Sequence, residues 1–125
     1  MIAYSTVGVN DMARATAFYD AVFAPLGGVR ETTSETWTGY SRAGDRGKFF
    51  LTRPFDRAVA TCGNGVMLAF LAEERAAVDA FHAEALRTGG SDEGPPGARE
   101  GMNPVFYAAY VRDPDGNKLC AFVRK

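Results

Sequence analysis

The sequence predicts a single α+β domain that contains two βαβββ modules, at about residues 1–53 and 64–125. Two observations support this prediction: the same order of strand, helix and strands occurs twice, and the chain ends in a strongly patterned β-hairpin. A length of 125 residues suits one domain with one core. Since a helix covers only one face of a sheet, we expect the two modules to form a curved mixed sheet around a central cleft, with the helices on the outer face.

The first module is expected to begin with a strand at Ile2–Val9 and to continue into a helix that Asn10 or Asp11 caps. A proline and two glycines near residue 26 end this helix. The Thr-rich segment Val29–Ser41 predicts two strands, and Lys48–Thr52 predicts a fourth. The helix itself is predicted from apolar side chains at helical spacing, namely Met12, Ala15, Phe18, Tyr19 and Val22.

The second module follows a connecting loop at Arg53–Asn64. Gly65–Leu71 predicts a strand, and Glu73–Arg87 has the apolar period of a helix that a glycine pair ends. Ser91–Asn103 is rich in proline and glycine and has few large apolar residues. We therefore expect a long loop there, with one short strand at most.

The hairpin at Val105–Phe122 reads VFYAAYVRDPDGNKLCAF. Its Asp-Pro-Asp-Gly run suits a type I turn followed by a left-handed glycine, which sets Asp113 opposite Asn117. Counting residues along both strands from the Asp113–Asn117 pair predicts which side chains lie opposite each other. One face of the hairpin is then aliphatic, and the other is aromatic and mixed, which suits a pocket wall. The aliphatic pairs are Val111–Leu119, Ala109–Ala121 and Tyr107–Val123, and the pairs on the other face are Tyr110–Cys120 and Ala108–Phe122.

The two modules can be aligned with each other. An offset of 63 residues places Ala17-Phe18 on Ala80-Phe81 in the helices. The same offset places Tyr4 on Met67, and the final strands align Lys48 with Lys118 and Phe50 with Cys120. From this repeat we expect four positions to point into the cleft, namely Tyr4, Phe50, Met67 and Cys120.

Composition excludes several classes of function. A net charge of −1 gives no electrostatic basis for nucleic-acid binding, and no apolar run reaches membrane-spanning length. The first residues lack the pattern of a signal peptide, and Cys62 and Cys120 fit no metal or redox spacing, so we expect reduced thiols in a cytoplasmic protein. His82 is the only histidine, which rules out a multi-histidine zinc site within one chain. We interpret it as a helix residue without a catalytic role.

Three segments carry a family resemblance: VGVNDMARATAFYDAVFAPLG, RAAVDAF and YAAYVRDPDGNKL. With them the chain resembles the vicinal oxygen chelate superfamily, which includes glyoxalase I, bleomycin-resistance proteins and extradiol dioxygenases. The resemblance implies a divalent metal in the cleft, held by the first and last strands of each module, and it implies a homodimer. Carried over to this sequence, the metal positions are Tyr4, Phe50, Met67 and Cys120.

The chain departs from the family at those four positions. Metal-binding relatives place His, Gln or Glu there, because such metals prefer imidazole and carboxylate donors. Phe50 has no donor, Met67 is a weak thioether ligand, and the Tyr4 phenol is neutral at pH 7. Cys120 alone could ligate a metal, so we expect neither a metal nor another cofactor.

The resulting hypothesis is a bleomycin-resistance-type protein that binds a small apolar or aromatic molecule without metal. An enzyme similar to lactoylglutathione lyase or to the dioxygenases is the alternative, and a scaffold that acts only through dimerisation is a third. Whether Trp37 or Tyr40 faces the cleft stays open, as does the choice for Tyr4 between ligand contact and simple packing. Cys120 is interpreted as a small buried hydrophobe. The expected cleft residues are Tyr4, Phe50, Met67, Tyr110, Cys120 and Phe122.

Overall fold

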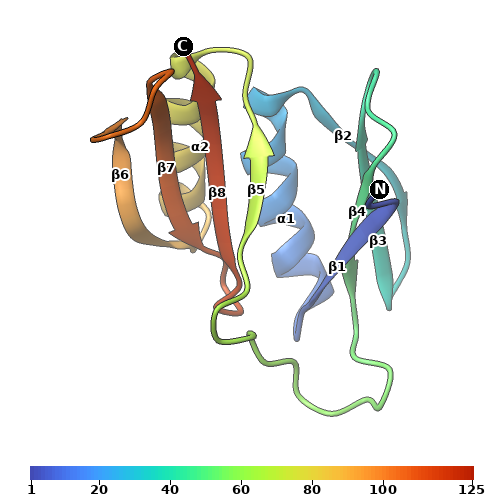
Figure 1. The fold of residues 1–125 in the computed structure, drawn as a ribbon. Coiled ribbons are helices and arrows are strands. Elements are labelled where there is room, and N and C mark those ends of the chain that lie inside the picture. Colours follow the sequence, from blue (N-terminus) through green and yellow to red (C-terminus); the bar gives the residue numbers. More distant parts are fainter.

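The computed structural model describes residues 1–125 as two helices and two four-stranded mixed sheets, which confirms the α+β class and the two modules (Figure 1). The first module contains β1 (Tyr4–Gly8), α1 (Met12–Phe23), the 3-10 helix η1 (Ala24–Leu26), β2 (Gly28–Thr33), β3 (Trp37–Arg42) and β4 (Lys48–Thr52). The second module contains β5 (Leu68–Leu71), α2 (Arg75–Arg87), β6 (Ser91–Arg99), β7 (Phe106–Arg112) and β8 (Lys118–Arg124). Neither helix is long and apolar enough to cross a membrane.

The strand order is the same in both modules. The first sheet has the order β1-β4-β3-β2 and the second has β5-β8-β7-β6, and in each the first strand pairs in parallel with the last strand of its module. The registers agree with the internal alignment. Phe50 lies opposite Thr6, and Cys120 lies opposite Ala69, which are each two residues beyond the aligned pair of Tyr4 and Met67.

Helix α1 begins at the cap that its sequence predicts. The Asp11 side chain accepts a hydrogen bond from the Arg14 amide at 3.0 Å, as an N-cap residue does. After the 3-10 turn, Gly27 adopts a φ of 77°, which ends the helical segment in a conformation that suits glycine. Figure 1 shows α1 between the two sheets and α2 behind the second sheet.

The C-terminal hairpin has the predicted register. All five predicted residue pairs are present, from Tyr107 opposite Val123 to Val111 opposite Leu119. At the turn, the Asp113 amide donates to the Asn117 carbonyl at 2.9 Å, and Gly116 has a φ of 90°. The turn residues thus determine which side chains share a face of the second sheet.

The prediction for Ser91–Asn103 was wrong. Ser91–Arg99 forms β6, a nine-residue strand that pairs with β7 through two register shifts. Because β6 is the edge of its sheet, Pro95 and Pro96 can be accommodated without removing a hydrogen bond between two central strands. The partner strand thus stabilises a strand that the local composition does not favour.

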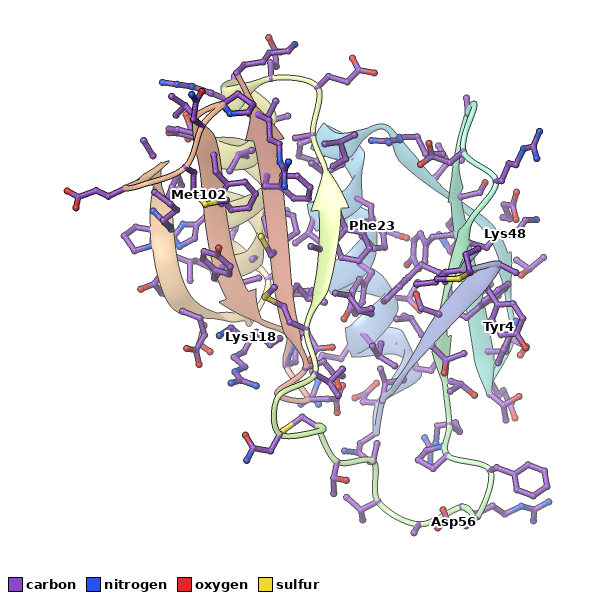
Figure 2. All side chains as sticks on the ribbon, viewed as in Figure 1. Tyr4, Phe23, Lys48, Asp56, Met102 and Lys118 are labelled. Carbon is purple, nitrogen blue, oxygen red and sulfur yellow. The ribbon has the colours of Figure 1, made fainter.

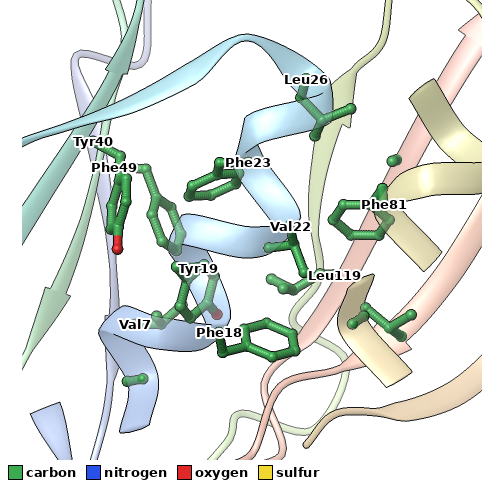
Figure 3. Packing of buried hydrophobic residues seen from close by; sticks show 14 of the residues in the cluster. Val7, Phe18, Tyr19, Val22, Phe23, Leu26, Tyr40, Phe49, Phe81 and Leu119 are labelled. Atoms are coloured by element: carbon green, nitrogen blue, oxygen red, sulfur yellow. The ribbon is translucent and has the colours of Figure 1, made fainter. Parts of the chain in front are cut away.

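One core joins both modules. It contains 21 buried residues from both helices and both sheets. In Figure 3, Phe23 and Tyr19 of α1 lie toward Phe49 of the first sheet, whereas Val22 lies toward Phe81 and Leu119 of the second module. We call the faces that contribute to this core the inward faces. The opposite, outward faces of the two sheets therefore point away from each other.

Candidate functional site

The outward face of the first sheet carries three aromatic rings. The Phe50 ring centroid lies 5.7 Å from that of Tyr4 and 4.6 Å from that of Trp37. Gly39 makes room for Phe50, since a Cβ there would lie 2.7 Å from its ring. Tyr4 itself is 61% exposed, so the three rings form a surface and not a filled core.

The orientation of β3 settles which of its aromatic residues faces outward. Trp37 faces outward, whereas Tyr40 lies in the core with 2% exposure. The Tyr40 hydroxyl donates to the Asp20 carboxylate at 2.9 Å. Burial, followed by this hydrogen bond, raises the Tyr40 pKa far above its ordinary value. Tyr40 is therefore a neutral donor at every physiological pH and supports the core.

The charges on the outward face of the first sheet neutralise each other. The Lys48 ammonium lies 2.9 Å from the Glu31 carboxylate, which also accepts a hydrogen bond from the Ser41 hydroxyl at 2.7 Å. The Ser41 hydrogen bond, and after it the Lys48 contact, lower the pKa of the Glu31 carboxyl. The pair stays charged at neutral pH and leaves little net charge on this face.

The outward face of the second sheet is aromatic and contains two small residues. The rings of Phe106 and Phe122 stack with centroids 4.9 Å apart. Tyr110 lies opposite Cys120, and Ala108 lies opposite Phe122. Ala108 and Cys120 are buried although they face outward, so neighbouring side chains already cover the floor between the rings.

Cations surround those rings. The Arg99 guanidinium carbon lies 5.2 Å from the centre of the Tyr110 ring, and the Lys118 ammonium lies 5.8 Å from it. The Arg124 guanidinium lies 5.9 Å from the centre of Phe106. These are distances at which a cation is attracted to the face of an aromatic ring.

Cys120 is poorly suited to nucleophilic attack. Its side chain is 1% exposed, and burial raises the pKa of the thiol to about 11. The reactive form of cysteine is the thiolate, which is scarce at neutral pH when the pKa is this high. Cys120 thus has the environment of a small core residue, and Cys62 is the exposed thiol.

The donor set does not fit the metal that the family resemblance implies. Phe50 places a hydrocarbon ring at its position, next to the phenol of Tyr4. The remaining two positions hold an exposed thioether, Met67, and the buried thiol of Cys120. No group of three or more His, Cys, Asp or Glu side chains in the chain is arranged to hold a metal ion. These side chains offer contact surface for organic groups and few donors for a divalent cation.

The six predicted cleft residues form two groups in one chain. Tyr4 and Phe50 belong to the first sheet, and Tyr110, Cys120 and Phe122 belong to the second, with Met67 exposed just before β5. Figure 2 shows Tyr4 and Lys118 on different sides of the molecule, with Phe23 of the core between them. The two groups therefore do not line one cleft within a single chain.

Sequence reasoning missed several residues of these faces. The sequence does not decide the orientation of Trp37, and it does not identify Phe106 or Arg99; Lys118 and Arg124 alternate with apolar residues, a pattern that suits either a solvated strand face or contacts to an anionic ligand group. Alternation along β7 could have identified Phe106, because it lies four residues before Tyr110 on the same face. Arg99 could not have been found, because its strand was expected to be a loop.

A hollow of about 370 Å³ lies elsewhere, between the modules. Its walls come from β1 and β4 on one side and from β5 on the other, with Phe23 and Leu26 among the apolar lining residues. None of the six predicted cleft residues lines it. It is a second place where a small molecule could bind, and no sequence pattern predicted it.

Comparisons with known proteins agree with this architecture. A family model described as the glyoxalase/bleomycin resistance protein/dioxygenase superfamily matches residues 1–121. The chain is similar to a glyoxalase/bleomycin resistance protein from Albidiferax ferrireducens T118, with 41% identity, a TM-score of 0.92 and 99% of each chain covered. No curated protein matches the chain.

Two more distant solved structures share the fold. A glyoxalase-related enzyme from Fulvimarina pelagi has 20% identity and a TM-score of 0.76, with 98% of this chain and 87% of that chain covered. A lactoylglutathione lyase from Agrobacterium tumefaciens has 22% identity and a TM-score of 0.66, with 98% of this chain and 92% of that chain covered.

Proposed function

The chain belongs to the glyoxalase/bleomycin resistance protein/dioxygenase superfamily, and on that premise we propose that it binds a small aromatic molecule without a metal ion. The observation that carries this proposal is the composition of the outward faces. Aromatic rings occupy both of them, and Phe50, Met67 and Cys120 stand where metal ligands would be needed. Aromatic side chains give large contact areas and favourable ring stacking to a planar ligand.

We further propose that the binding cleft forms between two copies of the chain. The outward face of the first sheet in one copy would lie opposite the outward face of the second sheet in the other. Two equivalent clefts result from such a symmetric pair. Each would have Tyr4, Trp37 and Phe50 on one wall and Tyr110 and Phe122 on the other. Exposed apolar side chains near the sheet edges, such as Ile2 and Leu71, support an interface there.

Calorimetric titration with 2-naphthoate tests the binding proposal. The protein is first treated with EDTA, and the titration is repeated after addition of Zn²⁺, Ni²⁺, Fe²⁺ or Mn²⁺. We expect saturable binding with the same dissociation constant in every sample, and Trp37, the sole tryptophan, should report it through a fluorescence change. Binding that appears only with metal would contradict the proposal.

Matched variants locate the ligand. Phe50→Ala and Phe122→Ala remove one ring from each outward face and should each weaken binding by about tenfold, which is the scale of one lost aromatic contact. Leu68→Ala alters the hollow between the modules and should leave binding unchanged. The reverse pattern would place the ligand in the hollow.

Sedimentation equilibrium should give a dimer, and a monomer that binds with full affinity would refute the shared cleft.

A further inference from the structure

The ligand class can be narrowed by comparing charge on the two outward faces. We propose that the bound molecule is an aromatic anion, and that Arg99 and Lys118 hold its acidic group beside the ring of Tyr110. This inference rests on the proposed function, because it assigns the ligand of the same site.

The two cations converge on one ring. The Arg99 guanidinium lies 5.2 Å and the Lys118 ammonium 5.8 Å from the centre of Tyr110. They reach it from opposite sides, because Arg99 belongs to β6 and Lys118 to β8, the two neighbours of β7. An anionic group placed between them would be attracted by both charges.

Arg99 is fixed in position by the protein itself. Its guanidinium donates to the carbonyl of Pro95 at 2.8 Å and to that of Gly97 at 3.2 Å. Glycine at 94 and 97 leaves space for it, since a Cβ at either position would lie 3.3 Å from a guanidinium nitrogen. The other N–H groups of Arg99 remain available. A donor that is held before the ligand arrives loses less conformational entropy on binding.

These cations have no acidic partner in the chain. None of its seven ion pairs includes Arg99, Lys118 or Arg124. By contrast, Arg112 on the same face is paired with Glu93, and Lys48 on the first sheet is paired with Glu31. The chain as a whole has a net charge of −1. A local excess of positive charge in such a protein attracts anions, and Arg favours carboxylates in particular.

The aromatic part of the ligand has a surface one step along the sheet. Phe106 and Phe122 stack there. Phe122 lies opposite Ala108, which is two residues from Tyr110 on β7, and Phe106 is four residues from Tyr110. Two residues along a strand span about 7 Å. This separation between Tyr110, where Arg99 and Lys118 lie, and the Phe122 ring suits a bicyclic aromatic acid better than a small inorganic anion.

Calorimetry with 2-naphthoate and 2-naphthamide tests the inference, because the two probes share one ring system and differ in charge. We expect 2-naphthoate to bind at least about tenfold more tightly, which is the effect of one charge-assisted hydrogen bond. Raising NaCl should weaken the binding of 2-naphthoate and leave that of 2-naphthamide unchanged.

Three variants test whether Arg99 and Lys118 cause the preference for 2-naphthoate over 2-naphthamide. Lys118→Gln and Arg99→Gln should each reduce the preference for 2-naphthoate several-fold and leave 2-naphthamide unaffected. The Lys118 side chain makes no hydrogen bond within the chain, so its variant should melt at the wild-type temperature even if Arg99→Gln is less stable. Arg87→Gln, at the end of α2 and paired with Glu84, is the control and should retain the preference.

The outcomes separate this inference from the proposed function. Equal affinity for the two probes would refute the anionic ligand and leave aromatic binding in place. A preference for 2-naphthoate that survives in both site variants would refute the assignment to Arg99 and Lys118. If neither probe binds, the proposed function and this inference fail together.

Discussion

The inward and outward faces of the two sheets differ in how their aromatic rings are surrounded. Phe49 and Phe50 are consecutive in β4. Phe49 packs among the rings of Tyr19, Phe23 and Phe70, whereas the aromatic neighbours of Phe50 are Tyr4 and Trp37. Side chains alternate between the faces of a strand, so one strand can serve the core and a binding surface at once. We infer that stability depends on the inward residues and ligand binding on the outward ones.

The largest expected effect on the free energy of unfolding comes from removing an aromatic ring from β4, and its size should depend on which face the ring occupies. Phe49→Ala should lower the free energy of unfolding by about 3–5 kcal/mol, because it leaves a cavity in the shared core. Phe50→Ala should lower it by about 1 kcal/mol, the value of an aromatic pair at a half-exposed site. Urea denaturation of both variants measures the two values. Equal losses would mean that the outward cluster also belongs to the core.

A second test concerns the buried carboxylate that joins the hairpin turn to α1. Asp113 accepts hydrogen bonds from the Tyr19 hydroxyl at 2.7 Å and from the Asp115 and Asn117 amides at 2.9 Å and 2.8 Å. Asp113→Ala should cost about 3 kcal/mol of unfolding free energy, because these buried donors lose their acceptor. Urea denaturation again gives the value.

An exposed carboxylate provides the control for that change. Asp45 pairs with Arg42 at the surface, so Asp45→Ala should cost less than about 1 kcal/mol. Tyr19→Phe removes a single donor to Asp113 and should fall between the two. Burial, and next the charge of Asp113, raise the Tyr19 pKa, so the hydroxyl remains a donor across the pH range of such experiments. A cost for Asp113→Ala no larger than that for Asp45→Ala would show that the turn does not hold the modules together.

The smallest effect concerns the two thiols. Cys62 is exposed, whereas Cys120 is buried on the outward face and has a pKa of about 11. At pH 8 only about one Cys120 thiol in a thousand is ionised, so Ellman's reagent should label one thiol per chain. Labelling of the second should require urea. Rapid labelling of a Cys62→Ser variant would show that the floor of the second sheet is open.

The same pKa determines how Cys120 affects stability at high pH. Because the folded protein holds this proton more tightly than the unfolded chain does, the contribution of the thiol is complete below about pH 9. It declines as the pH rises toward 11, where the unfolded state has already released the proton. Cys120→Ala should show a shallower decline over this range in urea denaturation.

Much of the fold could be predicted because its signals are local. The Asp-Pro-Asp-Gly turn determined the register of β7 against β8, and the alternation of side chains then assigned each residue to a face. Asp11 and the apolar spacing that follows it determined α1. The strand β6 could not be predicted, because its pairing with β7 overcomes a composition typical of loops.

The candidate site was predictable only in part. Repeat alignment identified Phe50 and Cys120 as equivalent outward positions, and their side chains argued against metal ligation. It could not place Arg99 over Tyr110, because that contact depends on the backbone path of β6. It also could not show that Trp37 faces outward, because the register of β3 against β4 depends on pairing between strands.

The sequence by itself therefore determined the two-module α+β architecture, the hairpin and the residue types at the family's metal positions, since each follows from local spacing and chemistry. Only the tertiary structure decided that both helices and both inward faces share one core. The reason is that burial of apolar surface depends on how the modules pack against each other, which no local pattern specifies. That packing turns the outward faces of the two sheets away from each other. On the outward face of the second sheet, Arg99 and Lys118 have no acidic partners.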